Sequence, residues 1–211
     1  MKNKKTETLS LVQLALFGAI IFIMAFTPFV GYIPLGFTKA TIIHVPVIIG
    51  SILLGPKKGA FLGFLFGVTS LINNTVNPTV TSFVFSPFYT AGIVSGGALS
   101  LVICFVPRIL VGVVPYYIYR LLVRLSAKES LSLMSAGLCG SLVNTVLVMN
   151  MIYLFFGSSY GSARGVAGNA LYSVILSVIC INGIPEAIVA AILTALIIKA
   201  VKSTRKVTIK K

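Results

Sequence analysis

The stretch "TIIHVPVIIGSILLGPKKGAFLGFLFGVTSLIN", residues 41–73, consists of two apolar segments on either side of a basic turn. The turn "GPKKG", residues 55–59, combines a Gly-Pro pair with two lysines, which is typical of a chain reversal at a polar surface. Neither 41–55 nor 60–73 contains a Lys, Arg, Asp or Glu. Because a bilayer is crossed by about 20 apolar residues, or fewer where a helix is buried in protein, this stretch predicts two short membrane helices joined by a tight turn.

The rest of the chain continues this pattern. Of its 211 residues, 57% are hydrophobic and only 9% are charged, against about 25% charged residues in soluble domains. We therefore expect an all-α membrane protein with one six-helix membrane domain over residues 1–200 and a basic tail over 201–211. Hydropathy places the six predicted spans at 9–27, 41–55, 59–73, 99–122, 131–156 and 170–199.

Charge predicts the orientation of these spans. The chain has 17 Lys and Arg but 3 acidic residues. In a soluble protein this balance would suggest nucleic acid as a partner, but in membrane proteins cytoplasmic loops concentrate Lys and Arg. In the six-span arrangement, fourteen of the 17 basic residues share the side of the N-terminus: positions 2, 4, 5, 57, 58, 120, 124, 128, 199, 202, 205, 206, 210 and 211. We therefore expect both termini in the cytoplasm of a bacterial cell, a multi-pass protein in the lipid bilayer, and no nucleic-acid partner.

Several functional classes lack the residues that they require. The chain contains no phosphate-binding Gly-x-x-x-x-Gly-Lys-[Ser/Thr] loop, so it is not expected to hydrolyse ATP itself. One histidine and three acidic residues supply too few groups for general acid–base catalysis. Cys104, Cys139 and Cys180 are isolated in apolar runs, which favours neither a metal site nor a disulfide framework. The sequence indicates a non-enzymatic protein without a metal or cofactor.

Polar side chains within the predicted spans are the candidates for function. Arg108 stands in the apolar run "FVPRILVG", residues 105–112, and Glu186 follows Pro185 in the last span. A charge in hydrocarbon requires a partner or a hydrated cavity. One interpretation is a structural Arg108–Glu186 ion pair; the other is an outward-facing pocket whose surplus of cations suits a small anion. The predicted substrate-binding residues are Arg108, Asn144, Asn182, Glu186, Asn73, Asn74, His44 and Lys39. His44 is also compatible with a purely structural role.

The long connection 74–98 contains no charged residue but many Asn, Thr, Ser and aromatic side chains. This composition is unusual for a solvent loop and favours a segment that folds over a small ligand, although a loop lying on the membrane surface is the alternative. Small residues four apart occur twice. Gly59, Gly63 and Gly67 favour close packing inside the bundle, and the pair Ala15 and Ala19 is equally compatible with packing and with an external interface.

Together these segments resemble the substrate-binding S components of energy-coupling factor (ECF) vitamin transporters. The resemblance covers essentially the whole chain and is carried by "TKATIIHVPVIIGSILLGPKKGAFLGFLFGVTSLINN", "TSFVFSPFY", "CFVPRILVG" and, on the first span, "ALFGA". Among these S components, the quoted segments are most similar to the pantothenate-specific branch. The resemblance implies six helices around an outward-facing pocket closed by loops, and a subunit that binds a vitamin but cannot pump it.

The resemblance also implies partners. These are a membrane coupling protein, which would meet the Ala15–Ala19 surface, and two cytoplasmic ATPase subunits. Pantothenate, with one carboxylate, one amide and two hydroxyls, is the expected substrate. An S component for riboflavin, folate or niacin, a stand-alone proton-coupled carrier and a non-transporting scaffold remain alternatives at this stage.

Overall fold

The structure is a computed structural model that describes residues 2–27, 30–35, 38–91, 94–166 and 168–209. Helices and two short hairpins follow one another in this order: α1 (Lys2–Phe26), β1 (Tyr32–Leu35), β2 (Thr38–Thr41), α2 (His44–Leu54), α3 (Pro56–Val76), the 3-10 turn η1 (Ser82–Val84), β3 (Thr90–Ala91), β4 (Val94–Ser95), α4 (Ala98–Val111), α5 (Val114–Arg124), α6 (Glu129–Arg164), α7 (Gly168–Val178), the π-helical η2 (Ile179–Gly183) and α8 (Ile184–Ile209). The chain is therefore a helical bundle with two small additions that hydropathy did not predict.

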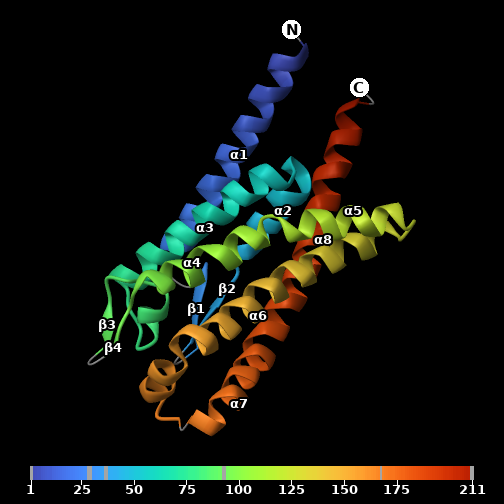
Figure 1. Cartoon of the computed structure of the whole chain (residues 1–211). Coiled ribbons are helices and arrows are strands. Elements are labelled where there is room, and N and C mark those ends of the chain that lie inside the picture. The colour runs from blue at the N-terminus through green and yellow to red at the C-terminus, as the bar shows by residue number, and fades with distance from the viewer. Residues whose placement is uncertain (1, 28–29, 36–37, 92–93, 167, 210–211) are drawn as a thin grey trace.

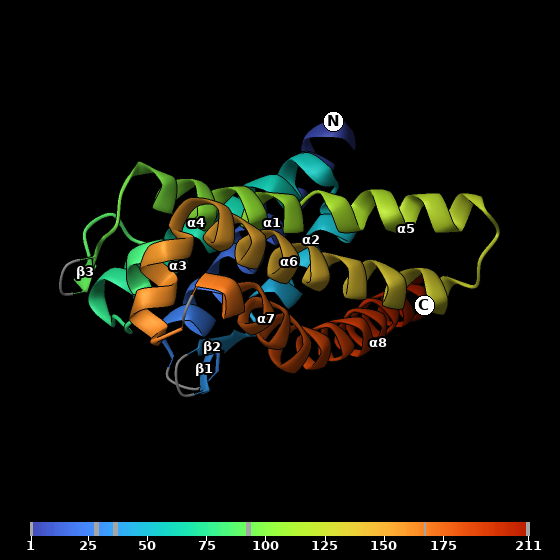
Figure 2. The ribbon, with the colours of Figure 1, turned by 60° about the horizontal axis from the view of Figure 1, so that its bottom comes forward.

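The bundle has two distinct ends (Figure 1). Both chain termini and the α5–α6 connection lie toward one end, and the β3–β4 hairpin and the α6–α7 connection lie toward the other. In the turned view, the α5–α6 hairpin and the β3–β4 hairpin are at opposite extremes of the molecule (Figure 2). The basic segments at the start of α1, around the α5–α6 connection and near the end of α8 therefore lie toward the same end, away from the β3–β4 hairpin.

Five segments are long and apolar enough to cross a membrane: Glu7–Phe26, Pro56–Val76, Ala98–Arg124, Glu129–Arg164 and Ala170–Thr204. They correspond to five of the six predicted spans. The exception is the predicted span 41–55, where α2 has only 11 residues and, at 1.5 Å per residue, reaches about 16 Å. The structure thus has five candidate spans and one shorter apolar helix in its described part, so the sixth span is not confirmed.

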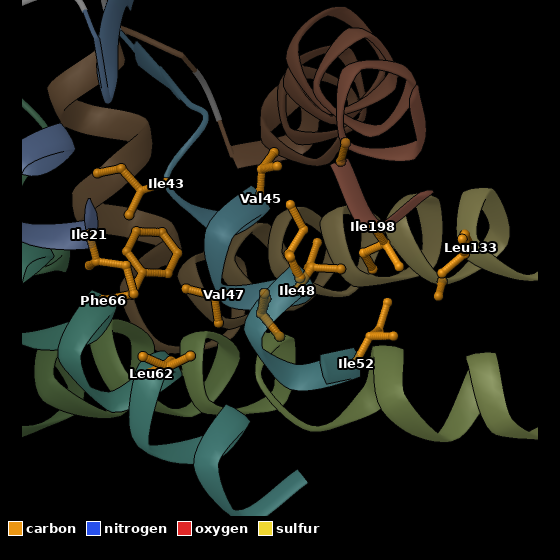
Figure 3. Close-up of a cluster of buried hydrophobic side chains, with 14 of the residues drawn as sticks. Ile21, Ile43, Val45, Val47, Ile48, Ile52, Leu62, Phe66, Leu133 and Ile198 are labelled. Atoms are coloured by element: carbon orange, nitrogen blue, oxygen red, sulfur yellow. The ribbon is translucent and has the colours of Figure 1, made fainter. Parts of the chain in front are cut away.

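The short helix α2 is buried along almost its whole length. Residues His44 to Ile52 are all buried, and α2 packs against α1, α3, α6 and α8. Figure 3 shows Val47, Ile48 and Ile52 of α2 among side chains from the surrounding helices. Because protein rather than lipid surrounds α2, it needs neither the length nor the polar flanks of a helix that spans a bilayer. The β1–β2 hairpin precedes α2 in the chain. Its two strands pair antiparallel, with Tyr32 opposite Thr41 and Leu35 opposite Thr38.

The three glycines of α3 permit a close crossing with α4. A methyl group on Gly59 would overlap the carbonyl oxygen of Gly112, and one on Gly67 would lie 2.6 Å from the Phe105 ring. A methyl group on Gly63 would overlap the carbonyl oxygen of Arg108 and lie 2.8 Å from Ile109 Cα. The prediction of internal packing for these glycines is therefore confirmed, and the crossing fixes the backbone that carries Arg108.

Polar contacts fasten the helices at the end that holds the termini. Lys202 of α8 forms an ion pair with Glu129 of α6, and its ammonium group donates a hydrogen bond of 3.2 Å to the Tyr119 hydroxyl of α5. The pair is substantially solvent-exposed, so its contribution to stability is small. α8 continues to Ile209, so its helical conformation extends into the segment 201–209 expected as a tail.

The glycine crossing generates a prediction. Gly63→Ala introduces a methyl group into backbone that has no flexible side chain to move aside, so we expect a loss of about 1–3 kcal/mol of stability. Helix propensity alone would favour alanine at this position. Gly97→Ala is the matched control, since nothing lies within 4 Å of the added carbon. Thermal unfolding in detergent measures both, and equal melting temperatures would contradict the close crossing.

Candidate functional site

One pocket in the described part of the chain gathers polar groups from α3, α4, α6, η2 and α8. It encloses about 810 Å³ of space between atoms, including open solvent at its mouth. Its wall mixes hydroxyl, amide, charged and apolar side chains: Thr41, Ser70, Asn74, Thr79, Thr81, Phe85, Arg108, Asn144, Thr145, Val148, Met149, Ile152, Tyr160, Val178, Asn182 and Glu186. Such a wall can orient a small polar ligand while removing it from water.

Arg108 is positioned by the proline that precedes it. Pro107 lies inside α4 and has no N–H, so it cannot donate the helical hydrogen bond to the carbonyl of Ile103 four residues earlier. The Arg108 guanidinium supplies that bond instead, with Nη1 donating to the Ile103 oxygen at 2.8 Å. The guanidinium carbon also lies 5.6 Å and 5.0 Å from the ring centres of Phe66 and Phe85. The run "FVPRILVG" therefore fixes a cation, only 6% exposed, in the pocket wall.

Glu186 brings the negative charge of the site. It lies in the first turn of α8, directly after Pro185, and its Oε1 accepts a hydrogen bond of 2.9 Å from the backbone N–H of Thr41. This bond joins α8 to the end of the β1–β2 hairpin. Arg108 and Glu186 both line the same pocket. The two side chains share one cavity, which is compatible with both interpretations of the sequence.

Two amides enter the pocket from α6 and η2. Asn144 is 5% exposed, and its side-chain oxygen has no hydrogen-bond partner among the described residues. A buried acceptor without a donor is costly, so a ligand donor would stabilise it. Asn182 lies in the π-helical turn, where Gly183 lets the chain approach Thr145 so closely that an added methyl carbon would lie 2.9 Å from Thr145 Cγ2. Short π-helical turns are frequent at functional sites.

Consecutive asparagines of α3 have different roles. Asn74 lines the pocket, where its amide donates to the Ser70 carbonyl oxygen at 2.8 Å and its oxygen accepts from the Ser82 hydroxyl at 2.8 Å. Asn73 points elsewhere, and its amide donates to the Ala25 carbonyl oxygen of α1 at 3.4 Å. Asn73 is therefore outside the pocket wall and joins α3 to α1, a role that the sequence did not predict.

The pocket wall does not include His44, and Lys39 cannot be assigned to it. His44 is 1% exposed at the start of α2 and is not among the lining residues. Lys39 lies in β2, and its side chain falls outside the described residues. Five of the eight predicted residues thus line one pocket: Arg108, Asn144, Asn182, Glu186 and Asn74.

Sequence reasoning missed other parts of the wall. Thr145, Val148, Met149 and Ile152 follow Asn144 at helical spacing, so the face of α6 could have been extended from that one residue. Thr79, Thr81 and Phe85 belong to the uncharged connection 74–98, which forms part of the pocket wall. Tyr160 and Thr41 carried no signal, because the kink in α6 and the β1–β2 hairpin that bring them in are not visible in hydropathy.

Ala15 and Ala19, the predicted docking residues, are not among the residues that line the pocket. Ala15 and Ala19 are both exposed on α1, and so are Leu11, Val12 and Leu16 around them. α1 is the least buried of the five candidate spans, with 17% of its most apolar stretch inside the protein. This face of α1 is consequently available to lipid or to another membrane protein.

Comparison with known proteins gives a consistent result. The sequence model of a family described as "ECF transporter, substrate-specific component" matches residues 9–198. A protein of Lactococcus lactis subsp. cremoris named "Pantothenic acid transporter PanT" is 39% identical over 204 residues, which is 96% of this chain and 98% of that protein. A protein of Leuconostoc mesenteroides subsp. mesenteroides named "Pantothenate transporter PanT" is 31% identical over 204 residues, 93% of each chain.

A solved structure shares the fold. The crystal structure of the S component for biotin from an ECF-type ABC transporter has a TM-score of 0.53 and 18% identity, and the match covers 94% of each chain. At this identity the likeness concerns the helical arrangement alone. Together, the family match over nearly the whole length, the two relatives and the shared fold show that the chain belongs to the substrate-specific components of ECF transporters, integral proteins of the bacterial plasma membrane.

Proposed function

We propose that the chain is the high-affinity binding subunit for pantothenate and delivers this vitamin for ATP-driven uptake by an ECF transporter complex. The observation that carries the proposal is the buried guanidinium of Arg108 in the wall of a pocket that combines polar and apolar side chains. Two relatives that align over almost the whole chain are named as pantothenate transporters, which selects this anion among the vitamins.

The chemistry of pantothenate matches the pocket group by group. Its carboxylate would accept hydrogen bonds from Arg108, whose charged donors favour a carboxylate over a neutral group. Its hydroxyls and amide offer donors for the Asn144 oxygen and further bonds for Asn182. Its dimethyl carbon suits the apolar side chains of Val148 and Ile152. In this arrangement Glu186 is not a ligand for the carboxylate but orients the Arg108 guanidinium.

The proposed orientation has the basic end of the bundle in the cytoplasm and the pocket facing outward. In this orientation the buried α2 acts as a sixth, partial span, and both termini are cytoplasmic. The chain would associate with a membrane coupling protein, through the Ala15–Ala19 face of α1, and with two cytoplasmic ATPase subunits. Small residues on an exposed helix face allow another helix to approach closely, which supports this docking surface.

The alternatives predict different behaviour. An S component for riboflavin, folate or niacin would bind that vitamin in place of pantothenate. A stand-alone proton-coupled carrier would accumulate substrate when reconstituted alone in liposomes under a proton gradient, whereas an S component without its partners does not. The family membership of the chain does not favour the carrier.

The first test is calorimetric titration of the purified protein with pantothenate, riboflavin, folate and niacin. We expect tight binding of pantothenate alone. Arg108→Ala should weaken it by about 100-fold or more, because the charge-assisted hydrogen bonds to the carboxylate are lost. Arg120→Ala is the matched control: Arg120 is exposed on α5, where it bonds to Tyr116, outside the pocket wall.

Assembly separates the ligand role of Arg108 from a structural one. Arg108→Ala should still co-purify with the coupling protein if the guanidinium serves the ligand. Lost assembly or a collapsed melting temperature would favour the structural ion pair with Glu186 instead. Tight binding of another vitamin and none of pantothenate would overturn the substrate assignment.

A second prediction uses two asparagines of the same helix. Asn144→Ala removes a pocket acceptor and should weaken pantothenate binding by about tenfold, the effect of one good hydrogen bond. Asn150→Ala should leave affinity unchanged, since Asn150 donates to the Val146 carbonyl oxygen and is not a pocket residue. Equal effects of the two substitutions in the same titration would remove Asn144 from the binding site.

A third prediction concerns docking. Ala15→Leu and Ala19→Leu enlarge an exposed surface without touching the pocket, so co-purification with the coupling protein should fall while pantothenate affinity stays unchanged. Ala200→Leu makes the same change at an exposed position of α8 and should preserve assembly. Normal complex formation with both α1 variants would exclude this face of α1 as the docking surface.

A further inference from the structure

Tyr160 combines near-complete burial with a place in the pocket wall. Its side chain is 2% exposed and packs within the cluster that includes Phe83, Met149 and Leu171. The apolar ring of Tyr160 suits this packing, but its buried hydroxyl also requires hydrogen-bond partners. The partners of this hydroxyl indicate what it can offer to a ligand.

A kink in α6 brings Tyr160 to the pocket. Phe156 departs from helical geometry with φ −131° and ψ 21°. Its ring packs edge-on against the ring of Phe83, with 5.9 Å between the two ring centres. The last turns of α6 are bent away from the axis of the preceding part (Figure 1). Gly165, with φ +67°, ends the helix in a left-handed conformation that suits glycine. The segment 157–164 is thus a short, separately oriented piece of helix that carries one pocket residue.

Arg164, one turn after Tyr160, determines the polarity of the hydroxyl. Its Nη2 donates to Tyr160 Oη at 2.9 Å, and its guanidinium carbon lies 5.2 Å from the ring centre. Arginine has donors but no acceptor, so the tyrosine oxygen must be the acceptor in this bond. The phenolic hydrogen is then left for an acceptor other than Arg164. Because Tyr160 also lines the pocket, an oxygen of a bound ligand can be that acceptor, and the neighbouring positive charge strengthens the phenol as a donor.

We propose that Tyr160 is a ligand-binding residue whose hydroxyl donates a hydrogen bond to a carbonyl or carboxylate oxygen of the bound molecule, and that Arg164 is a positioning residue acting through it. The proposal rests on the proposed function, because it concerns the same pocket. It adds a second donor to the wall, supplied by a different helix from the one that carries Arg108. It also gives a role to an arginine that stands apart from the basic end of the bundle.

The test is a double-mutant cycle measured by calorimetric titration with pantothenate. Tyr160→Phe keeps the ring and removes only the hydroxyl, so affinity should fall about tenfold while the melting temperature stays close to that of the unmodified protein. Arg164→Gln should weaken binding by a smaller factor in the unmodified background and have no effect in the Tyr160→Phe background. Arg164→Lys should restore part of the loss, since lysine can still donate to the hydroxyl.

Tyr153→Phe is the matched control on the same helix. Tyr153 is 40% exposed, packs against Tyr172 and is not a pocket residue, so the same chemical change there should leave affinity unaltered. If Tyr160→Phe binds pantothenate within twofold of the unmodified protein, the assignment of Tyr160 is wrong and the proposed function stands. Additive losses in the double variant would show that Arg164 acts independently of Tyr160. If the unmodified protein binds no vitamin, the proposed function fails, and this inference fails with it.

Discussion

The site depends on holding a guanidinium inside an apolar bundle. A charge in that position is expensive, and the protein reduces the cost by surrounding Arg108 with groups that suit a cation. The carbonyl of Ile103, released from the helix by Pro107, accepts one of its N–H groups, and the rings of Phe66 and Phe85 lie within 6 Å of its charged carbon. The same proline that interrupts the helix thus creates the acceptor that holds the arginine.

The α3–α4 crossing extends this constraint to the fold. Gly63 lies against the backbone of Arg108, so α3 and α4 approach each other at the residue that carries the charge. Glu186, also in the pocket wall, accepts the backbone N–H of Thr41 and links α8 to the β1–β2 hairpin. The short helix α2 begins at His44, shortly after Thr41, and its buried residues pack against the surrounding helices in the core. Pocket and core are therefore built on the same few contacts.

The parts of the fold that hydropathy and charge describe could be predicted, and the parts that depend on helix direction could not. Apolar length predicted six spans, of which five are long enough to cross a membrane; the same measure does not distinguish a lipid-facing helix from α2, whose apolar residues face protein. Arg108 and Glu186 were found because charges are rare in apolar runs. Asn73 and Asn74 could not be separated in the sequence, since a rotation of one residue sends one to α1 and the other to the pocket. Tyr160 depends on the non-helical backbone of Phe156, which hydropathy did not reveal.

An experimental structure of the protein with bound pantothenate tests the central claim most directly. The account predicts the vitamin in the pocket between α4, α6 and α8, with its carboxylate oxygens within hydrogen-bond distance, about 3 Å, of the Arg108 guanidinium. A carboxylate bound elsewhere, with Arg108 turned instead toward Glu186 alone, would contradict the account. In that case the arginine would be a structural ion-pair partner, and the recognition of the anion would have to be sought in other residues.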